Sequence, residues 1–275
     1  MSISPFIIWL GGKKQLVPYI ISKSPTKFNN YYEPFVGSGA VLFGLLPKNA
    51  IINDNNTALI NAYKRIRDSL NETLKIIDKY DKEIVYGKND YYVNLREKYN
   101  NKMVNNEYDV ELAAMFIFLN KHCFNGLYRI NTKGLFNASY NKSTCTSYNL
   151  ESIIEVSNYL QNVKLLNEDF EVACKNATKG DFVFLDSPYI PIKEKTFSAY
   201  TKEGFTLEDH KRLASLFDEL TTRGCYCMTT NHNVQLIHEL YGNKGYKINV
   251  VSVKRKINPD PTKRKDVEEV IICNY

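Results

Sequence analysis

An apolar strand, a glycine turn, the start of a helix and a second short strand follow one another within residues 31–55. The first apolar segment leads into "EPFVGSGAVLF", and the second, "AIIN", is followed directly by an acid. This order and spacing are typical of the opening unit of a parallel α/β sheet. The chain is therefore expected to adopt a fold of the α/β class.

A mostly helical block then interrupts the pattern. After this opening unit, apolar side chains recur at helical spacing, as in Leu59, Ile60 and Tyr63. No clear strand character returns before residues 163–168. The interruption predicts a helical domain inserted into the α/β sheet.

The sheet pattern resumes in the second half of the chain. "KGDFVFLD" is almost continuously apolar, as expected for a strand covered on both faces, and "CYCMTTN" and "VEEVIICNY" predict further strands. Between them, Thr206 is a predicted helix N-cap and Gly224 a predicted helix end. We therefore predict a Rossmann-like sheet domain of residues 1–56 and 160–275 around an inserted domain of residues 57–159.

Composition indicates an ordinary globular protein of 275 residues, with 44% hydrophobic and 24% charged residues. No segment approaches the roughly 20 apolar residues that span a bilayer, and no basic stretch precedes the short apolar run at the N-terminus. The six cysteines show no repeated CxxC spacing, which favours reduced thiols over disulfides. We expect a cytoplasmic protein without a membrane partner.

The cysteine pair at 225 and 227 and the basic runs each allow two interpretations. Cys225 and Cys227 could bind a metal or lie in a buried strand, and we favour the strand and predict no metal site. The net charge is +6, with basic residues gathered at positions 13–14 and 254–265. Such runs either face solvent or bind a polyanion.

The glycine turn has the features of a nucleoside site. Gly37 and Gly39 allow a ligand to approach the backbone, and Asp54 follows the next strand, where a carboxylate can accept hydrogen bonds from a ribose diol. Position 42 is Leu, so the full dinucleotide fingerprint is absent. S-adenosylmethionine, a nucleoside without a pyrophosphate, fits this pattern. The alternative is that Asp54 only caps the following helix.

A second acid ends the strand "VFLD". Asp186 and the backbone carbonyl of Ser187 can accept hydrogen bonds from an exocyclic amine, while Pro188 fixes the backbone and Tyr189 offers a ring for stacking. Two acceptors that hold amine hydrogens out of the plane of a base make its nitrogen a better nucleophile toward a methyl sulfonium. The alternative is a strand that ends in an ordinary Asp-Ser turn.

These segments resemble the DNA adenine methylase family, the α-class amino-methyltransferases that modify GATC sites, over nearly the whole chain and in the family's order. The matching segments are "WLGGKK" (9–14), "EPFVGSGAV" (33–41), "INDNN" (52–56), "FNGLYRINTKGLFNASY" (124–140), "NEDF" (167–170), "DSPYIPI" (186–192), "FSAYTKEGFT" (197–206) and "EEVIICNY" (268–275). The resemblance implies a class I methyltransferase sheet and a helical recognition domain that carries a β-hairpin.

The resemblance also implies a role for individual residues. S-adenosylmethionine would be bound by Trp9, Lys13, Phe35, Gly37, Gly39, Asp54, Asp169 and Asp186, and Asp186, Ser187, Pro188 and Tyr189 would form the catalytic segment. Double-stranded DNA would be contacted by residues that match the family's reading hairpin, Phe124, Asn125, Leu127 and Arg129. We also expect DNA contacts from Lys133 and from the basic run that begins at Lys254 and Arg255. Arg129 can read guanine O6 and N7 in the major groove, and Leu127 or Phe124 can fill the space left by a flipped base.

Three positions depart from the family pattern. Ser187 replaces the second residue of the usual D-P-P-Y segment, which keeps the carbonyl acceptor but loses rigidity. Ile8 stands where a lysine often helps to read the outer guanine, and Ser139 replaces a proline after the hairpin. Slower catalysis and relaxed choice of the outer base are expected.

The sequence thus predicts an enzyme that methylates adenine N6 at GATC in double-stranded DNA. The alternatives are an N4-cytosine methyltransferase, which Asp186 disfavours, and a DNA-binding protein whose catalysis is impaired at Ser187. A monomer is expected, with a dimer as the alternative. A restriction endonuclease encoded nearby is a further candidate partner.

Overall fold

A computed structural model describes residues 3–9, 11, 13, 15–192, 204–254 and 266–275. Arg255 and the rest of the predicted DNA clamp up to residue 265 lie outside the described residues, as do Lys14 and residues 197–203. The chain divides into two compact units. The first unit comprises Met1–Gly12, Val36–Leu46 and Asn53–Glu168, and the second unit comprises Lys13–Phe35, Pro47–Ile52 and Asp169–Tyr275. The domain boundaries expected from the sequence stay a prediction.

The strands form a mixed seven-stranded sheet, so the predicted α/β class is confirmed. The order is β3-β2-β1-β4-β5-β7-β6; the pairs β1–β2, β1–β4 and β4–β5 are parallel, and β7 is antiparallel to β5 and β6. The strands are β1 (Tyr31–Glu33), β2 (Ala50–Asn53), β3 (Val163–Leu166), β4 (Phe182–Leu185), β5 (Tyr226–His232), β6 (Lys247–Lys254) and β7 (Asp266–Cys273). Strand β6 was not expected from the sequence.

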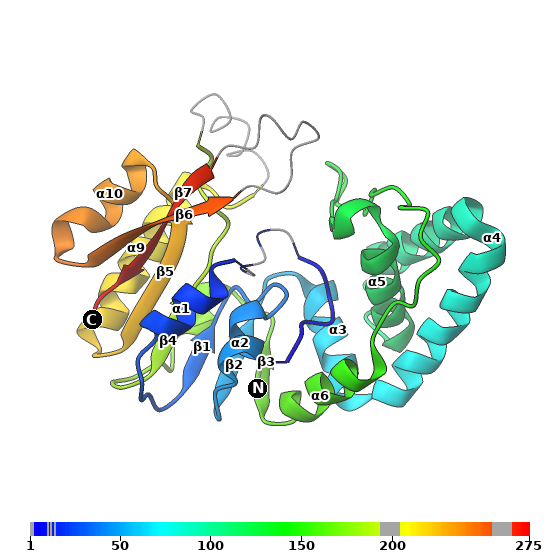
Figure 1. The fold of residues 1–275 in the computed structure, drawn as a ribbon, viewed down its shortest axis with the longest axis horizontal. Coiled ribbons are helices and arrows are strands. Elements are labelled where there is room, and N and C mark those ends of the chain that lie inside the picture. Colours follow the sequence, from blue (N-terminus) through cyan, green and yellow to red (C-terminus); the bar gives the residue numbers. More distant parts are fainter. Residues whose placement is uncertain (1–2, 10, 12, 14, 193–203, 255–265) are drawn as a thin grey trace. The chain divides into compact units, whose positions relative to one another are not determined.

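In the second unit, helices that include α9 (Leu207–Thr222) and α10 (Gln235–Tyr241) pack on one face of β4, β5 and β7 (Figure 1). The other described helices of this unit are α1 (Val17–Lys23), α7 (Phe170–Ala173) and the 3-10 turn η2 (Gly242–Lys244). Apolar side chains of α9 and α10, such as Phe217 and Tyr241, pack with Val183 of β4 and Val270 of β7 in a buried cluster. This layer supports the strands whose ends carry the predicted catalytic segment.

Helix α9 begins and ends as predicted. Thr206 and Asp209 form a capping box, in which the Thr206 side chain accepts from the Asp209 N–H and the Asp209 side chain accepts from the Thr206 N–H. Gly224, just past the helix, has φ +83°, a left-handed conformation that favours glycine. An N-cap of this kind contributes about 1 kcal/mol to stability.

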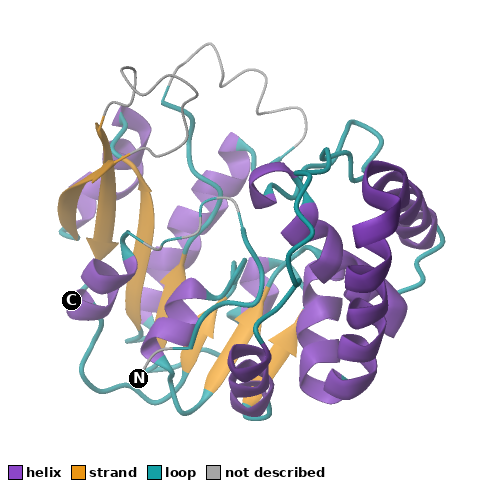
Figure 2. Cartoon of the chain, turned by 45° about the vertical axis from the view of Figure 1, so that its right-hand side comes forward, coloured by secondary structure: helices purple, strands orange, loops and turns teal. Residues whose placement is uncertain are grey.

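The first unit is largely helical (Figure 2). Its helices are α2 (Ala40–Leu45), α3 (Thr57–Asp68), α4 (Leu70–Val104), α5 (Val110–His122), the 3-10 turn η1 (Phe124–Gly126) and α6 (Leu150–Leu160). Helix α5 is buried along nearly its whole length because it packs between α3 and α4. Helix α4 is interrupted at Lys88, which has φ +45° and ψ −125°.

The segment predicted to form the DNA-reading hairpin follows α5. Two isolated antiparallel bridges pair its arms, Cys123 with Tyr140 and Ile130 with Phe136, around a turn closed by a hydrogen bond from Gly134 N–H to the Asn131 carbonyl. The hairpin as a DNA-reading element stays a prediction.

Among the described helices, none has both the length and the apolar character needed to cross a membrane.

Candidate active site

Asp186 follows directly after β4, at the carboxyl end of the parallel strands. Its Oδ1 atom lies 3.0 Å from Lys13 Nζ and accepts a hydrogen bond of 2.5 Å from Thr230 Oγ1 on β5. Both contacts are shielded, since the Lys13 and Asp186 side chains are only 9% and 16% exposed. Lys13 and Thr230 thus hold the Asp186 carboxylate in one orientation, because both contact its Oδ1 atom.

Tyr189 is held on several sides. Its hydroxyl donates a 2.9 Å hydrogen bond to Glu269 Oε2 on β7, and Lys13 Nζ lies 4.1 Å from its ring centroid. The His232 ring packs edge-on at 4.9 Å. Burial, together with the nearby charges of Asp186 and Glu269, raises the pKa of Tyr189 well above its usual value. The side chain is therefore a neutral phenol with a fixed ring.

Hydrogen bonds to β5 hold the backbone after the catalytic segment. The Ile190 N–H donates to Asn231 Oδ1 at 2.9 Å, and His232 Nδ1 lies 2.7 Å from the Ile190 carbonyl oxygen. The Ser187 side chain is 2% exposed, and its hydroxyl lies 3.4 Å from the Pro188 carbonyl oxygen. These contacts restrain a loop that lacks the usual proline at position 187.

The glycine turn lies in the first unit. Gly37 and Gly39 have φ +49° and +70°, and a Cβ atom on Gly37 would lie 2.7 Å from Trp9 Cδ1. The hydroxyl of Tyr63 donates to the Gly37 carbonyl at 3.0 Å. Both glycines are therefore required by backbone conformation and by close packing.

Asp54 closes this turn. Its Oδ2 atom accepts from the Gly37 N–H at 3.1 Å and its Oδ1 atom from the Asn56 N–H at 3.0 Å. Burial raises the pKa of Asp54, and these two hydrogen bonds oppose that shift. Helix α3 is capped by Asn56, whose side chain accepts from the Leu59 N–H, so the alternative role of Asp54 as the helix cap is wrong.

Asp169 and Phe35 belong to the second unit. Asp169 caps α7, and its Oδ1 atom accepts from the Glu171 N–H and from Arg212 Nη2, each at 2.9 Å. Phe35 packs against Phe170 at 5.4 Å and against Phe205 at 5.7 Å. Aromatic faces beside a carboxylate are suited to binding a flat heterocycle that carries an amine.

The DNA-contacting candidates described in the first unit are mostly exposed. Phe124 is 61% exposed, and Asn125 has φ +59°. Arg129 is exposed and is held by Asn137, because Arg129 Nε donates to Asn137 Oδ1 at 2.8 Å and Nη2 to the Asn137 carbonyl at 3.3 Å. Leu127 is half-buried and Lys133 is exposed.

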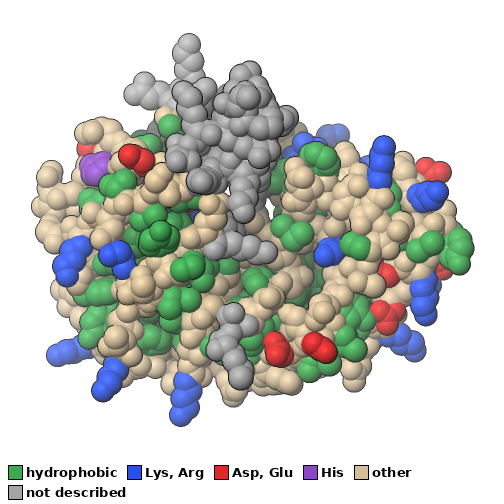
Figure 3. Space-filling model, viewed as in Figure 1, with side chains coloured by type: hydrophobic (Ala, Val, Ile, Leu, Met, Phe, Trp, Pro, Cys, Tyr) green, Lys and Arg blue, Asp and Glu red, His purple; other side chains and the backbone are tan. Residues whose placement is uncertain are grey.

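Basic side chains do not gather in one patch on the face shown in Figure 3, where Lys and Arg are scattered among the described residues. Lys254 is the last residue of β6. Its predicted partner Arg255 lies outside the described residues, so the phosphate clamp stays a prediction.

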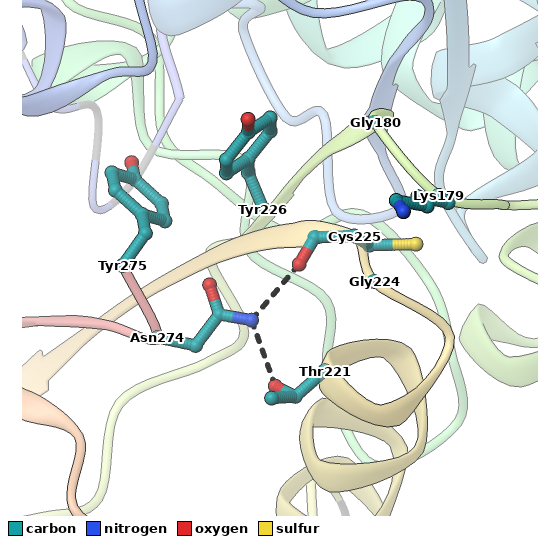
Figure 4. A pocket seen from close by; sticks show the side chains of 8 residues that line it. All are labelled: Lys179, Gly180, Thr221, Gly224, Cys225, Tyr226, Asn274 and Tyr275. Carbon is teal, nitrogen blue, oxygen red and sulfur yellow. Dashed lines mark hydrogen bonds between the residues drawn. The ribbon is translucent and has the colours of Figure 1, made fainter.

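A separate pocket of about 270 Å³ contains none of the predicted site residues (Figure 4). It is lined by Lys179, Gly180, Thr221, Gly224, Cys225, Tyr226, Asn274 and Tyr275. Asn274 Nδ2 donates to Thr221 Oγ1 and to the Cys225 carbonyl, both at 2.9 Å. Cys225 and Cys227 are buried, and burial raises the pKa of the Cys225 thiol to about 11. The pocket lies where β4 and β5 begin, away from the strand ends that carry Asp186.

Four residues around the site were not identified from the sequence: Thr230, Asn231, His232 and Glu269. The polar run "TTNH" at the end of an apolar strand was a usable signal for the first three. Glu269 had no local signal, because its position depends on the antiparallel register that pairs it with His232.

The mixed seven-stranded sheet is consistent with a methyltransferase fold. A model of the D12 class N6 adenine-specific DNA methyltransferases matches residues 9–257, and the chain belongs to this family. The resemblance to the DNA adenine methylases is thereby confirmed.

Similar proteins extend over the full chain. The Type II methyltransferase M1.LlaDCHI of Lactococcus lactis subsp. cremoris is 37% identical, covering 100% of this chain and 96% of the relative. The Type II methyltransferase M.MjaIII of Methanocaldococcus jannaschii is also 37% identical, with complete coverage of both chains. The DNA adenine methylase of Escherichia coli K12 is 28% identical, covering 97% of this chain and 93% of the relative.

Proposed function

We propose that this chain is a site-specific DNA methyltransferase that transfers a methyl group from S-adenosylmethionine to adenine N6 at GATC in double-stranded DNA. The observation that carries the proposal is the environment of Asp186, at the end of β4, beside Lys13 and Tyr189. Within this proposal the activity is that of class EC 2.1.1.72. The protein works as a monomer, and a restriction endonuclease of matching specificity is its candidate partner.

The residues present fit S-adenosylmethionine. In the first unit, Asp54 is oriented by two backbone N–H groups beside a turn that excludes a Cβ atom at Gly37. Each carboxylate oxygen keeps a lone pair that can accept a hydrogen bond from a ribose hydroxyl. In the second unit, Phe35 would contact the adenine ring, and Asp169 would accept a hydrogen bond from its amine. When bound, the cofactor supplies an electrophilic methyl group on a sulfonium.

The catalytic segment would act on the target amine. Asp186 and the Ser187 carbonyl accept hydrogen bonds from the two N6 hydrogens, which turns the nitrogen lone pair out of conjugation with the ring. The nitrogen would then form a bond to the methyl carbon as the carbon–sulfur bond breaks with its electrons on sulfur, and one N6 proton would pass to water. Tyr189, anchored by Glu269, provides the stacking face. Charge-assisted acceptors of this kind contribute about 10²–10³-fold in rate.

The target base would have to leave the duplex, since its amine is otherwise shared with thymine, at a cost of a few kcal/mol. Leu127 or Phe124 would fill the vacated space, and Arg129 would read guanine. Asn137 already holds the Arg129 guanidinium in one orientation, which reduces the entropy lost on binding. Residues 57–159 would then serve as the target-recognition domain.

Restriction protection tests the proposal. Plasmid is incubated with the purified protein and S-adenosylmethionine, and is then digested with enzymes that are blocked by, require, or ignore adenine methylation at GATC. Resistance to the first enzyme with cleavage by the other two supports the proposal. Full sensitivity to the first enzyme, with cofactor bound and labelled methyl incorporated elsewhere in the DNA, contradicts GATC as the site.

The matched control is Asp186→Asn, which keeps the size of the side chain and removes its charge. We expect loss of protection with DNA affinity retained within about tenfold, because Asp186 acts on the amine and not on the duplex. Protection that persists at the wild-type rate contradicts the catalytic role of Asp186.

A further inference from the structure

Trp9 packs directly against the glycine turn within the first unit. A Cβ atom on Gly37 would lie 2.7 Å from the indole Cδ1 and 3.2 Å from Nε1, so backbone and ring are in close contact. The Gly37 N–H in turn donates to Asp54. A shift of this turn when a ligand binds must therefore move the indole as well.

A second neighbour of the indole is Tyr128. The two rings are stacked, with centroids 5.4 Å apart and planes 19° apart. Tyr128 also stacks on Phe136 at 5.3 Å, and its hydroxyl lies 3.0 Å from that of Tyr99. Tyr128 immediately precedes Arg129, so its position sets the backbone from which the guanidinium extends.

Ile8 also contacts the loop that starts at residue 124 and contains Tyr128. The Asn120 side chain pairs with the Ile8 backbone through two hydrogen bonds of 2.8 Å, and its Nδ2 atom lies 3.3 Å from the Gly126 carbonyl. Gly126 has φ +64°, and a Cβ atom there would lie 2.5 Å from Ile8 Cγ2. Asn120 is only 2% exposed. Residues 8 and 9 are thus fixed against the loop that starts at residue 124.

Asn56 provides a second connection between Asp54 and Tyr128. The Asn56 N–H donates to Asp54. Burial raises the pKa of Tyr128, and the side chains of Tyr99 and Asn56 oppose that shift. Tyr128 is therefore linked to the turn by its stack on Trp9 and by an electrostatic effect of Asn56. These contacts connect Asp54 with the backbone beside Arg129 through packed side chains.

We propose that Tyr128 is a positioning residue that couples binding at the Gly37–Asp54 turn to guanine reading by Arg129, with Trp9 as the packed link. The coupling rests on the proposed function, since it takes the turn as a cofactor site and Arg129 as a DNA reader. A ligand that orders the turn orders Tyr128, and DNA that orders Arg129 orders the turn. Thermodynamic linkage requires the two effects to be equal in size.

Binding measurements test the coupling without turnover. The Kd of S-adenosylhomocysteine is measured by calorimetry for the free protein and for the protein saturated with a short GATC duplex. The ratio of the two Kd values is the coupling factor. For the wild type we expect about tenfold tighter binding in the presence of the duplex, within the usual range of coupled sites. Tyr128→Ala should bring the factor to within about twofold of one, with the Kd of the free protein changed by less than about threefold.

Two further variants separate positioning from general stability. Tyr128→Phe keeps the stacked ring and should retain most of the coupling. Tyr140→Ala removes another stacked pair of the first unit, since Tyr140 lies 5.2 Å from Tyr92 with planes 26° apart. It should leave the coupling factor unchanged. If Tyr128→Ala does not fold, Tyr128→Leu is judged by the same criterion.

The outcomes are distinct. A wild-type factor near one, or a full factor in the folded Tyr128 variant, overturns the coupling while leaving the proposed function intact. Equal loss of coupling in Tyr140→Ala also overturns it, because the effect is then not specific to Tyr128. Failure of the wild type to bind S-adenosylhomocysteine at all contradicts the proposed cofactor, and with it the coupling.

Discussion

Lys13 Nζ lies 3.0 Å from Asp186 Oδ1, in a pair whose side chains are only 9% and 16% exposed. The same ammonium lies 4.1 Å from the Tyr189 ring centroid. One cation therefore neutralises the carboxylate and contacts the aromatic face of the catalytic segment. An ion pair this shielded is poorly screened by salt, and removing one partner leaves an uncompensated charge.

Replacing Lys13 should impair the reaction more than it impairs DNA binding. In Lys13→Met the stem is kept and the charge is lost, so Asp186 loses its ionic partner and Tyr189 loses the ammonium over its ring. We expect kcat to fall about 10²-fold or more, with Kd for DNA within about tenfold. Lys13→Arg should recover part of the rate. Single-turnover kinetics would check this, and an unchanged kcat in Lys13→Met would contradict the role of the pair.

The hydrogen bond from Tyr189 to Glu269 should matter less than the ring itself. Tyr189→Phe removes the hydroxyl and leaves Glu269 without this donor, while keeping the stacking face. We expect kcat to fall about threefold to tenfold for Tyr189→Phe and at least 10²-fold for Tyr189→Ala. Glu269→Gln keeps an acceptor for the hydroxyl and should stay close to wild type. A loss in Glu269→Gln as large as in Tyr189→Ala would show that the charge of Glu269, and not its hydrogen bond, is what matters.

Arg129 should determine which base is preferred, and Asn137 should determine how firmly the Arg129 guanidinium is held for that contact. Arg129→Ala is expected to lose about 1–3 kcal/mol of discrimination at the guanine that it reads. Asn137→Ala removes the acceptor that lies 2.8 Å from Arg129 Nε and should cause a smaller loss at the same base. Competition binding with duplexes substituted at each base pair of GATC measures both. If Arg129→Ala weakens binding equally for all duplexes, Arg129 contacts phosphate and does not read a base.

Stability should fall in mild acid because of His210. Its side chain is 5% exposed and packs edge-on against Phe205 at 4.8 Å. Burial lowers the pKa of His210 from 6.5 to about 4, against a smaller opposing effect of Asp209. Between these values the unfolded chain binds more protons than the folded one, so stability is lost as pH falls. The free energy of unfolding should drop by up to about 3 kcal/mol from this group.

Urea unfolding at several pH values between 7 and 4.5 measures this effect. His210→Gln removes the titrating group, so its stability should decline less steeply over the same range. Identical slopes in the wild type and the variant would show that carboxylates, and not His210, account for the acid sensitivity.

Local signals were sufficient to predict much of the second unit. Helix α9 was predicted from Thr206 and Gly224, because capping and chain reversal depend on only a few neighbouring residues. Strand β4 was predicted from its continuous apolar run. Strand β6 was not, since "KINVVSVK" mixes apolar and basic residues and is defined by pairing with β7.

The contacts around the candidate site depend on pairings across long separations. Asn120 meets Ile8 across 112 positions, and Glu269 meets Tyr189 across 80. Asn120 stands in none of the matched segments, and Glu269 lies in a segment that predicted only a strand, so the sequence did not identify either residue as a partner. Residues such as Asp186 could be predicted because a strand that ends on an acid is a local signal, whereas their supporting partners are set by the tertiary fold.

The most direct test of the proposed function is nucleoside analysis of the product. DNA is incubated with the protein and isotopically labelled S-adenosylmethionine, digested to nucleosides and analysed by mass spectrometry, with Asp186→Asn treated in parallel. The proposal predicts labelled N6-methyldeoxyadenosine with the wild type and at least a 10²-fold loss with Asp186→Asn. Labelled N4-methyldeoxycytidine, or no labelled nucleoside from a wild-type protein that binds both DNA and cofactor, would contradict it.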